Sequence, residues 1–213
     1  MKIIYEDNDI LATEKPPGIS MSDFFPGLKK VHRLDKDTSG ILLAAKNDKS
    51  LIFFQKQFKN RKVEKKYSAL VIGTVKNDQG RIETLIGRAP KDRKKQKIYL
   101  PAEPEARAKG KREAITDYKV KKRFENYTLL EVFPKTGRKH QIRCHFSYLG
   151  HPIAGDKIYG FKNQKCPKSL KRQFLHADYI KIKLISGEYK ELFSPLPEDL
   201  KLCLKNLKKI SRK

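Results

Sequence analysis

The sequence predicts an α+β fold built on a mainly antiparallel mixed sheet. Apolar and polar residues alternate in two pairs of neighbouring segments. The first pair is 114–123 with 127–133, the second is 180–185 with 188–193, and both patterns are typical of antiparallel hairpins. The amphipathic helical patterns are few and separated by other elements, so they do not alternate regularly with strands. Because the 213 residues show no internal repeat and no linker, we expect a single domain.

The chain begins with two short apolar runs, 3–5 and 10–12, which predict strands on either side of a polar turn. Two prolines and a glycine then stiffen and turn the chain at 15–18, and residues 20–30 are typical of a loop. The apolar run 41–45 is bounded by polar residues and predicts a buried strand. The polar stretch before this strand, 31–40, therefore forms a loop held by a rigid element, a common setting for functional groups.

A helix of about three turns follows the buried strand. Asn47 and Ser50 are capping residues at its start, and Leu51, Phe54 and Phe58 fall on one helical face. We expect this helix to end at Arg61 and to pack on the sheet.

Two strands are expected next, at 67–72 and 81–86, since apolar residues alternate in the first and Gly73 closes it. After the hairpin 114–133, a helix is predicted from about 138 to 149, with Gly150 as its stop signal. Its apolar stripe contains Ile142, while Arg143 lies beside the buried face. A guanidinium in that position needs a carboxylate partner.

The final hairpin, 180–193, leads through two prolines into a last helix with Glu198 and Asp199 in its first turn. The apolar face of this helix contains Leu200, Cys203, Leu204 and Leu207. The basic tail after it is expected to fray.

The charge of the chain indicates a polyanionic partner. Lys and Arg number 49 against 24 acidic residues, a formal net charge of +25. Such an excess is typical of proteins that bind nucleic acid or anionic membranes. No apolar stretch is long enough to span a bilayer and no signal peptide is evident, which favours a cytoplasmic protein that binds RNA or DNA. The basic insertion at about 88–112 is expected to be a phosphate-gripping arm that includes Lys94 and Lys95.

The cysteines and histidines predict neither a disulfide framework nor a metal site. Three cysteines lie far apart, and none has zinc-ligand spacing. His140 and His145 are five residues apart, which places them on different faces of a helix. No glycine-rich nucleotide loop is present either, so we expect no cofactor.

Five segments resemble the signature motifs of the RluA-type RNA pseudouridine synthases, in the family's order and with plausible spacings. The central motif is His32-Arg33-Leu34-Asp35 with Thr38-Ser39-Gly40, and the other four are Lys15-Pro16-Pro17-Gly18, Tyr67 to Gly73, Gly137 to His145, and Leu175-His176-Ala177. From the residue types alone, a surface ion pair between Arg33 and Asp35 is slightly favoured over a functional site. The resemblance implies instead an RNA-modifying isomerase with a bent sheet and a cleft across it. It also implies the catalytic domain alone, without the small N-terminal S4-like domain of many members.

The resemblance implies Asp35 as the catalytic carboxylate, Arg143 as its partner and Tyr67 as the active-site tyrosine. A carboxylate can act as a nucleophile at C1′ or as a base on the ribose, and an arginine keeps it ionised. An aromatic face can hold the detached uracil while it turns. These residues leave both mechanistic routes open.

Further residues are expected to contact the RNA, with Arg33 favoured over His32 to fill the gap left by the flipped base. The full set is Lys15, His32, Arg33, Lys94, Lys95, Arg138 and Ile142. The expected substrate is ribosomal or transfer RNA, bound by a monomer. Two other functions compete: a non-catalytic RNA-binding protein on the same fold, and a nucleic-acid hydrolase, for which a metal-ligand set and a second placed carboxylate are lacking.

Overall fold

The chain folds into two compact units. The computed structural model describes residues 2–20, 24, 27–90, 92, 94–100, 102–107, 110–164 and 166–208. The first unit contains Met1–Tyr67 and Leu175–Pro197, and the second contains Ser68–Phe174 and Glu198–Lys213. The chain passes from one to the other within strand β5 (Glu64–Ile72), between Tyr67 and Ser68. The single domain expected from the sequence stays a prediction.

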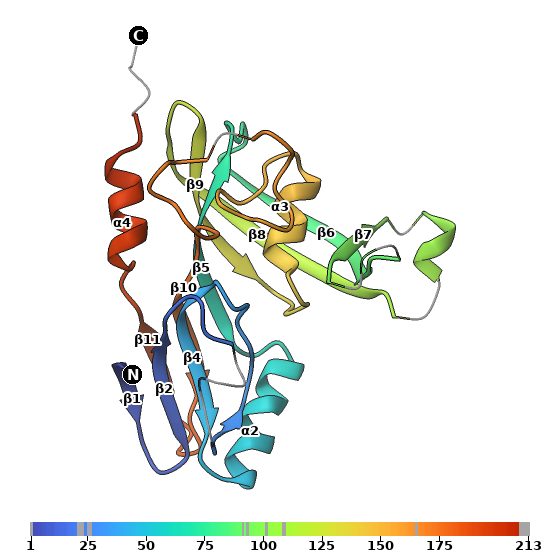
Figure 1. Cartoon of the computed structure of the whole chain (residues 1–213). Helices are drawn as coiled ribbons and strands as arrows, with labels where there is room; N and C mark the ends of the chain where they lie inside the picture. Colours follow the sequence, from blue (N-terminus) through green and yellow to red (C-terminus); the bar gives the residue numbers. More distant parts are fainter. Residues whose placement is uncertain are drawn as a thin grey trace. The chain divides into compact units, whose positions relative to one another are not determined.

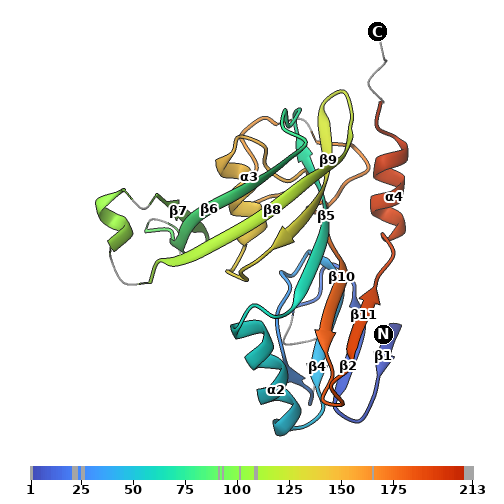
Figure 2. The same cartoon turned by 180° about the vertical axis from the view of Figure 1, so that it is seen from behind.

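The sheet of the first unit is mixed. Its strands follow the order β1-β2-β4-β10, with β3 on β4 and β11 on β10. Most pairs are antiparallel, but β4 and β10 run parallel, and Figure 2 shows β10 and β11 side by side. The bounds are β1 (Lys2–Glu6), β2 (Ile10–Lys15), β3 (Lys29–Lys30), β4 (Ser39–Ala45), β10 (Leu175–Lys183) and β11 (Tyr189–Phe193).

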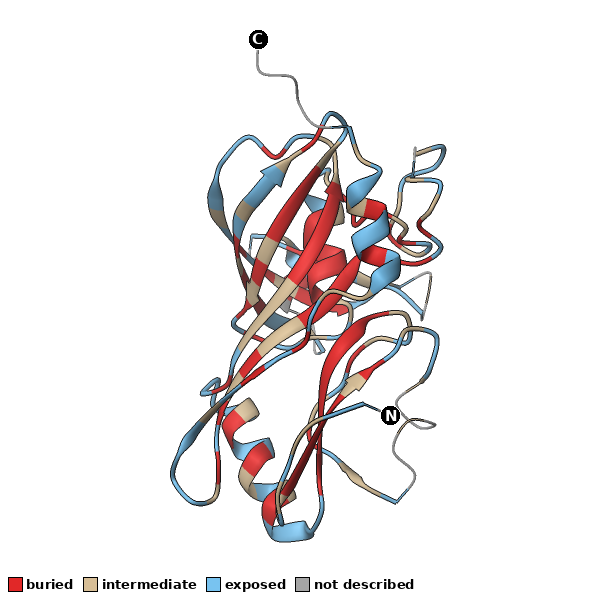
Figure 3. Ribbon diagram, turned by 90° about the vertical axis from the view of Figure 1, so that its left-hand side faces the viewer, coloured by how far each residue is buried: buried red, intermediate tan, exposed pale blue. Residues whose placement is uncertain are grey.

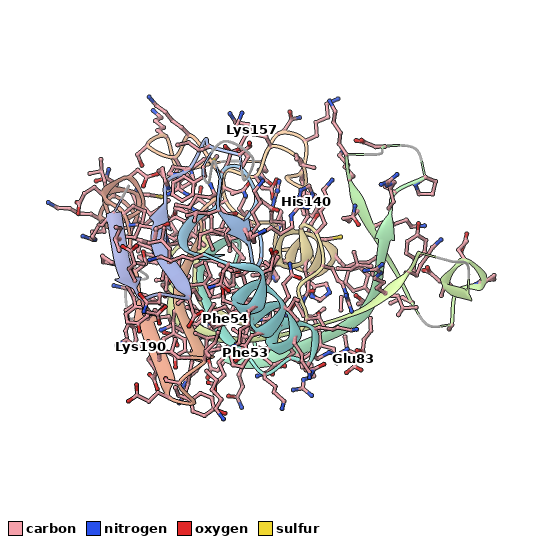
Figure 4. The ribbon with its side chains drawn as sticks, turned by 90° about the horizontal axis from the view of Figure 1, so that it is seen from below. Phe53, Phe54, Glu83, His140, Lys157 and Lys190 are labelled. Atoms are coloured by element: carbon pink, nitrogen blue, oxygen red, sulfur yellow. The ribbon has the colours of Figure 1, made fainter. Side chains whose placement is uncertain are left out.

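Helix α2 (Asp48–Lys59) covers one face of this sheet. Asn47 and Ser50 form the reciprocal capping box that starts it, in which the Asn47 side chain accepts from the Ser50 N–H. Phe54, labelled in Figure 4, is fully buried among apolar side chains of β2, β4 and β10. The alternation of buried and exposed residues along this helix is visible in Figure 3. The helix predicted from capping and periodicity is confirmed.

The strands of the second unit follow the order β5-β9-β8-β6-β7, in which β9-β8, β8-β6 and β6-β7 are antiparallel pairs (Figure 1). Long pairings join β6 to β8 and β8 to β9, so the predicted hairpin is confirmed. The bounds are β6 (Gln79–Arg88), β7 (Gln96–Tyr99), β8 (Arg112–Arg123), β9 (Tyr127–Pro134), with helices α3 (Gln141–Tyr148) and α4 (Glu198–Lys205). Leu200 and Cys203 anchor α4 in this unit.

Several expected boundaries were wrong. Helix α3 begins at Gln141 rather than near 138, because His140 adopts a left-handed conformation (φ 54°) and Arg138 forms a turn bonded to the Gln141 side chain. The basic insertion contains β7, which pairs with β6, and the short helical turn Pro104–Arg107. The loop at 20–30 contains β3. Lys91, Arg93 and Lys109 of the basic insertion lie outside the described residues, as do residues 21–23, 25 and 26 of the loop.

The predicted α+β class with a mainly antiparallel mixed sheet is confirmed. Among the described residues, no helix has the length and apolar content required to cross a membrane.

The parallel contact between β4 and β10 depends on a glycine. Gly40 pairs with Ala177, and a Cβ atom at Gly40 would overlap the Ala177 carbonyl oxygen. Gly40 also has φ +118°, a conformation that residues with side chains rarely adopt. Two of the recognised motifs therefore meet at this point.

We predict that Gly40→Ala lowers the free energy of unfolding by at least about 3 kcal/mol, because the strain of positive φ adds to the overlap with backbone. Urea denaturation measures this loss. Gly187→Ala is the matched control, since Gly187 has φ +97° but open space around it. That variant should lose only about 1–2 kcal/mol. Equal losses in the two variants would show that the contact with Ala177 does not constrain the fold.

Candidate active site

The loop before β4 is fixed by a buried lysine. The Lys15 ammonium donates to the carbonyl oxygens of Pro16, Ile19 and Lys36 at 2.8, 3.1 and 2.8 Å. The side chain is buried, and its ammonium group has three protons, one for each of these three carbonyl oxygens. The structure gives Lys15 this supporting role, and the RNA contact expected from the sequence would require its amine to leave these carbonyls.

His32 also supports this loop from within. Its Nε2 accepts a hydrogen bond from the Leu43 N–H at 3.1 Å, and its ring stacks on Phe58 at 4.8 Å. Burial, with the positive charge of Lys65 as a second cause, lowers the pKa of His32 to about 3. A neutral ring held in this way positions its neighbours, and the RNA contact of His32 stays a prediction.

Between these supports, Arg33 is exposed and Asp35 is half-buried. The Asp35 carbonyl accepts from the Thr38 N–H at 3.1 Å, which closes the turn into β4. The described residues offer the Arg33 guanidinium no hydrogen bond or ion pair. Arg33 is thus available to a ligand of this loop.

Asp35 and Tyr67 lie close enough to interact electrostatically within the first unit. Tyr67 packs on the apolar cluster that contains Leu34 and Ala177. Burial first, and then the negative charges of Asp35 and Asp178, raise the pKa of Tyr67 above its ordinary value of 10.0. At neutral pH the side chain is therefore a protonated phenol. Asp178, which the sequence did not single out, adds a second carboxylate near this tyrosine.

The histidine of the Leu175-His176-Ala177 motif joins β4 to the end of β11. His176 Nε2 donates to the Ser194 carbonyl at 3.1 Å, and Nδ1 lies 2.9 Å from the Ser39 hydroxyl. Since the carbonyl only accepts, a neutral His176 accepts from Ser39 through Nδ1. This buried connection fixes the strand that follows Asp35.

In the second unit, Arg143 forms a buried, two-pronged ion pair with Asp156. Nε and Nη2 of Arg143 donate to the two carboxylate oxygens at 2.7 and 2.9 Å, and the Asp156 side chain is fully buried. Asp156 Oδ1 also accepts from the N–H groups of Ile158 and Tyr159. The carboxylate partner that the sequence required for Arg143 is thus present, and it is a residue that sequence reasoning missed.

The electrostatics of Asp156 follow from this pairing. Burial alone would raise the pKa of its carboxyl group, but Arg143 and the two backbone N–H groups outweigh it and lower the pKa below 3.8. The Arg143 guanidinium also lies over the Tyr159 ring, 5.2 Å from its centroid. A signal for this partner existed in the sequence, because Asp156 is an acidic residue after a glycine and close to the end of the helix.

The remaining motif residues around Arg143 hold α3 in place. The Gln141 side chain joins Thr136 and Thr116, and His145 bonds Thr116 and Thr84 through its two ring nitrogens. Burial lowers the pKa of His145 to about 4, so this ring is neutral. Figure 4 labels His140, the left-handed residue that directly precedes the first residue of α3.

The other expected RNA contacts also lie in the second unit. Ile142 is buried on α3, and Arg138 Nε donates to the Glu113 carbonyl at 2.8 Å. Lys94 and Lys95 are exposed just before β7. Within the described part of the chain, no three His, Cys, Asp or Glu side chains gather as metal ligands.

Comparison with known proteins gives a consistent result. The family model for RNA pseudouridylate synthase matches residues 26–148. A Bacillus subtilis protein, the uncharacterized RNA pseudouridine synthase YlyB, is 36% identical over 98% of this chain and 73% of its own length. Ribosomal large subunit pseudouridine synthase D of Borreliella burgdorferi is 35% identical over 97% and 68%.

An uncharacterized RNA pseudouridine synthase of Aquifex aeolicus is 42% identical to this chain. The match covers 80% of this chain and 59% of the length of that relative. Among solved structures, human RNA pseudouridylate synthase domain containing 1 matches with a TM-score of 0.81 and 29% identity, over 95% of this chain and 86% of the human chain.

We predict that Asp156→Asn lowers the free energy of unfolding by about 3–5 kcal/mol at neutral pH, since it leaves the buried guanidinium without its anion. Chemical denaturation measures the loss. Asp199→Asn is the matched control, because Arg172 and Asp199 form a similar two-pronged pair whose carboxylate is 45% exposed. The control should lose no more than about 1 kcal/mol.

The pH dependence provides a second check on this prediction. Asp156 has a lower pKa folded than unfolded, so its contribution is present above pH 3.8 and disappears as the pH falls through the folded value. The difference between wild type and Asp156→Asn should therefore shrink in acid. A difference that stays constant below the folded pKa would contradict the assigned charge of Asp156.

Proposed function

Since the chain belongs to the RluA-type family of RNA pseudouridine synthases, we propose that it converts uridine to pseudouridine in RNA, with Asp35 as the catalytic carboxylate. The observation that carries this proposal is the proximity of Asp35 and Tyr67 in the first unit, where burial first, and then the Asp35 charge, raise the pKa of the phenol. Lys15 and His32 hold the backbone of the Asp35 loop on both sides.

Asp35 would act on the ribose of the target nucleotide. The N1–C1′ bond must break, the uracil must turn, and C5 must then bond to C1′. A carboxylate serves either as a nucleophile at C1′ or as a base on the ribose, and in both cases it must be ionised. Asp35 is half-buried, so the protein covers part of this residue and the rest is open to a bound nucleotide.

Arg143 is the proposed partner of Asp35, as the family resemblance implies. The two residues belong to different units, and the support for the pair comes from the second unit alone. Asp156 accepts from both Nε and Nη2, so the orientation of the planar guanidinium is fixed before any further carboxylate meets it. A buried guanidinium in a fixed orientation suits the task of keeping a second carboxylate ionised.

Tyr67 is proposed to hold the detached uracil by stacking. Its raised pKa favours the phenol over the phenolate at neutral pH, which supports a stacking and hydrogen-bonding role. Arg33 is proposed to occupy the gap left by the flipped base, since it is exposed beside Asp35.

RNA is the proposed substrate, either ribosomal or transfer RNA. The name of the Borreliella burgdorferi relative makes large-subunit ribosomal RNA the first to test. Pseudouridine mapping of RNA from a strain without the gene, compared with its parent, would identify the modified position. Loss of one pseudouridine from ribosomal RNA would support this choice, and loss from transfer RNA alone would overturn it.

We predict that Asp35→Asn abolishes turnover while RNA binding and unfolding temperature stay near wild type, because the change removes only the anion. Tritium release from RNA labelled at uracil C5 measures turnover. Asp48→Asn is the control, since Asp48 is exposed at the start of α2 and should keep full activity. Activity of Asp35→Asn within about tenfold of wild type would rule out Asp35 as the catalytic group, given the 10²–10⁴-fold effect of such groups.

We predict that Asp35→Ala and Arg143→Ala have non-additive effects on stability, with a coupling above about 0.5 kcal/mol, because the pair that the family resemblance implies would share its interaction energy. A double-mutant cycle by thermal unfolding measures the coupling. The same cycle with Arg172→Ala in place of Arg143→Ala should be additive, since Arg172 pairs with Asp199. Additive effects in both cycles would show that Asp35 and Arg143 do not touch.

We predict that RNA affinity falls steeply with salt, and that Lys94→Gln with Lys95→Gln flattens the slope of log affinity against log salt by about 1.4, since each phosphate contact on a single strand contributes about 0.7. Fluorescence anisotropy over a salt series measures this slope. Lys168→Gln with Lys171→Gln removes the same charge at exposed positions elsewhere in the unit and should leave the slope nearly unchanged. Equal slopes in both double variants would mean that Lys94 and Lys95 are only solvated.

A further inference from the structure

The second unit contains a large cavity that the proposed catalytic residues do not use. Its volume is about 790 Å³, within the 300–1,000 Å³ typical of small-molecule sites. Three segments line it: described residues between Ala89 and Ile98 together with Glu103, the end of α3, and the loop 158–160.

The cavity has fixed walls. The Tyr159 hydroxyl accepts from the Gln96 N–H at 2.7 Å, and Ser147 Oγ donates to the Tyr159 carbonyl at 2.9 Å. The Cys144 thiol contacts the Gln96 carbonyl at 3.6 Å. These contacts connect all three segments, so the cavity is formed before any ligand enters.

The lining combines apolar surface with one accessible aromatic ring. Ile98 is buried in the wall and Ile158 is half-buried. Tyr148, at the last position of α3, is 50% exposed and lines the opening. A half-exposed tyrosine beside an apolar hollow suits the face of a flat, unstacked ring.

The rim of the cavity is basic and has few internal counterions. Lys95 and Lys97 line it, and the ammonium groups of Lys97 and Lys111 lie 4.9 and 4.7 Å from the centroid of the same ring, Tyr99. Within the described ranges, none of these three lysines has a carboxylate partner. Lys111 is not itself a lining residue, but it shares the Tyr99 ring with Lys97, so it adds positive charge close to the rim.

The two acidic residues of the lining already have structural roles. Asp92 Oδ1 accepts from the Lys94 N–H at 2.9 Å, and Glu103 Oε2 accepts from the Leu100 N–H at 3.3 Å. They hold the turns of the segment that carries the lysines. The site therefore combines an apolar hollow, an aromatic ring and a cationic rim.

We propose that this cavity binds one unstacked nucleotide of the RNA substrate other than the target uridine. Its base lies in the hollow against Tyr148, and its flanking phosphates contact Lys95, Lys97 and Lys111. This inference rests on the proposed function, which supplies RNA as the ligand. The bound base contacts Tyr159, whose ring packs under Arg143, so occupancy also buttresses that guanidinium.

Binding of a short fluorescein-labelled oligouridylate tests the aromatic part of the site. All variants carry Asp35→Asn, so that no turnover occurs. Tyr148→Ala should weaken binding about tenfold, as loss of one base–aromatic stack does. Tyr189→Ala is the matched control, since Tyr189 is a similarly exposed tyrosine in the first unit and its loss should change affinity less than twofold. Equal effects of the two variants would overturn the proposal.

An abasic version of the same oligomer separates base from phosphate. With it, Tyr148→Ala should have no effect, whereas Lys97→Gln with Lys111→Gln should still weaken binding more than Lys119→Gln with Lys171→Gln, a pair of exposed lysines elsewhere in the unit. If Tyr148→Ala weakens the abasic oligomer equally, no base occupies the hollow. If uridine monophosphate displaces the oligomer at equal concentration, the site belongs to a free nucleotide and the proposal is wrong.

The experiments distinguish a cavity that binds no nucleotide from a chain that has no pseudouridine synthase activity. The binding measurements use a variant without the Asp35 anion, and the tritium-release measurement uses the intact cavity. Thermal unfolding of Tyr148→Ala confirms its fold, since the ring is half-exposed and its loss leaves no enclosed void.

Discussion

The buried pair of Arg143 and Asp156 is the interaction on which the second unit depends most. A guanidinium with a 4% exposed side chain is tolerable in an apolar interior only beside an anion of fixed geometry. Asp156 supplies it and also accepts the N–H groups of Ile158 and Tyr159, so the same carboxylate shapes the loop after α3. That loop places Tyr159 under the guanidinium and makes it a wall of the cavity. One ion pair therefore connects the helix, the loop and the hollow.

In the first unit, a polar loop is fixed by hydrogen bonds to its backbone, and its proposed functional side chains are not fully buried. Lys15 gathers three carbonyls from both ends of the loop, and His32 accepts a backbone N–H from β4. Gly40 lets β4 approach β10 closely enough for Ser39 and His176 to bond. Most residues of the recognised motifs thus act as supports, and they leave Arg33 exposed and Asp35 half-buried beside Tyr67.

The two neutral histidines, His32 and His145, also act as structural supports. Burial lowers the pKa of His32 and His145 well below neutrality, so both rings are uncharged partners for hydroxyl or N–H groups. A motif histidine often suggests proton transfer, but a ring that resists protonation between pH 5 and 8 is better suited to fixing the backbone. The proposed chemistry accordingly relies on a carboxylate, a guanidinium and a phenol.

The sequence alone determined the elements whose signals are local. The capping pair Asn47 and Ser50 and the apolar spacing after it predicted α2, and alternation predicted the two hairpins, because period and capping depend on neighbouring residues. The family motifs likewise singled out Asp35, Tyr67 and Arg143. Only the tertiary structure could show that Arg143 binds Asp156, that the Lys15 amine serves three carbonyls, and that β7 lies inside the basic insertion. These outcomes depend on which distant groups are buried together, since the cost of burying a charge or an unpaired backbone group selects partners that no local pattern specifies.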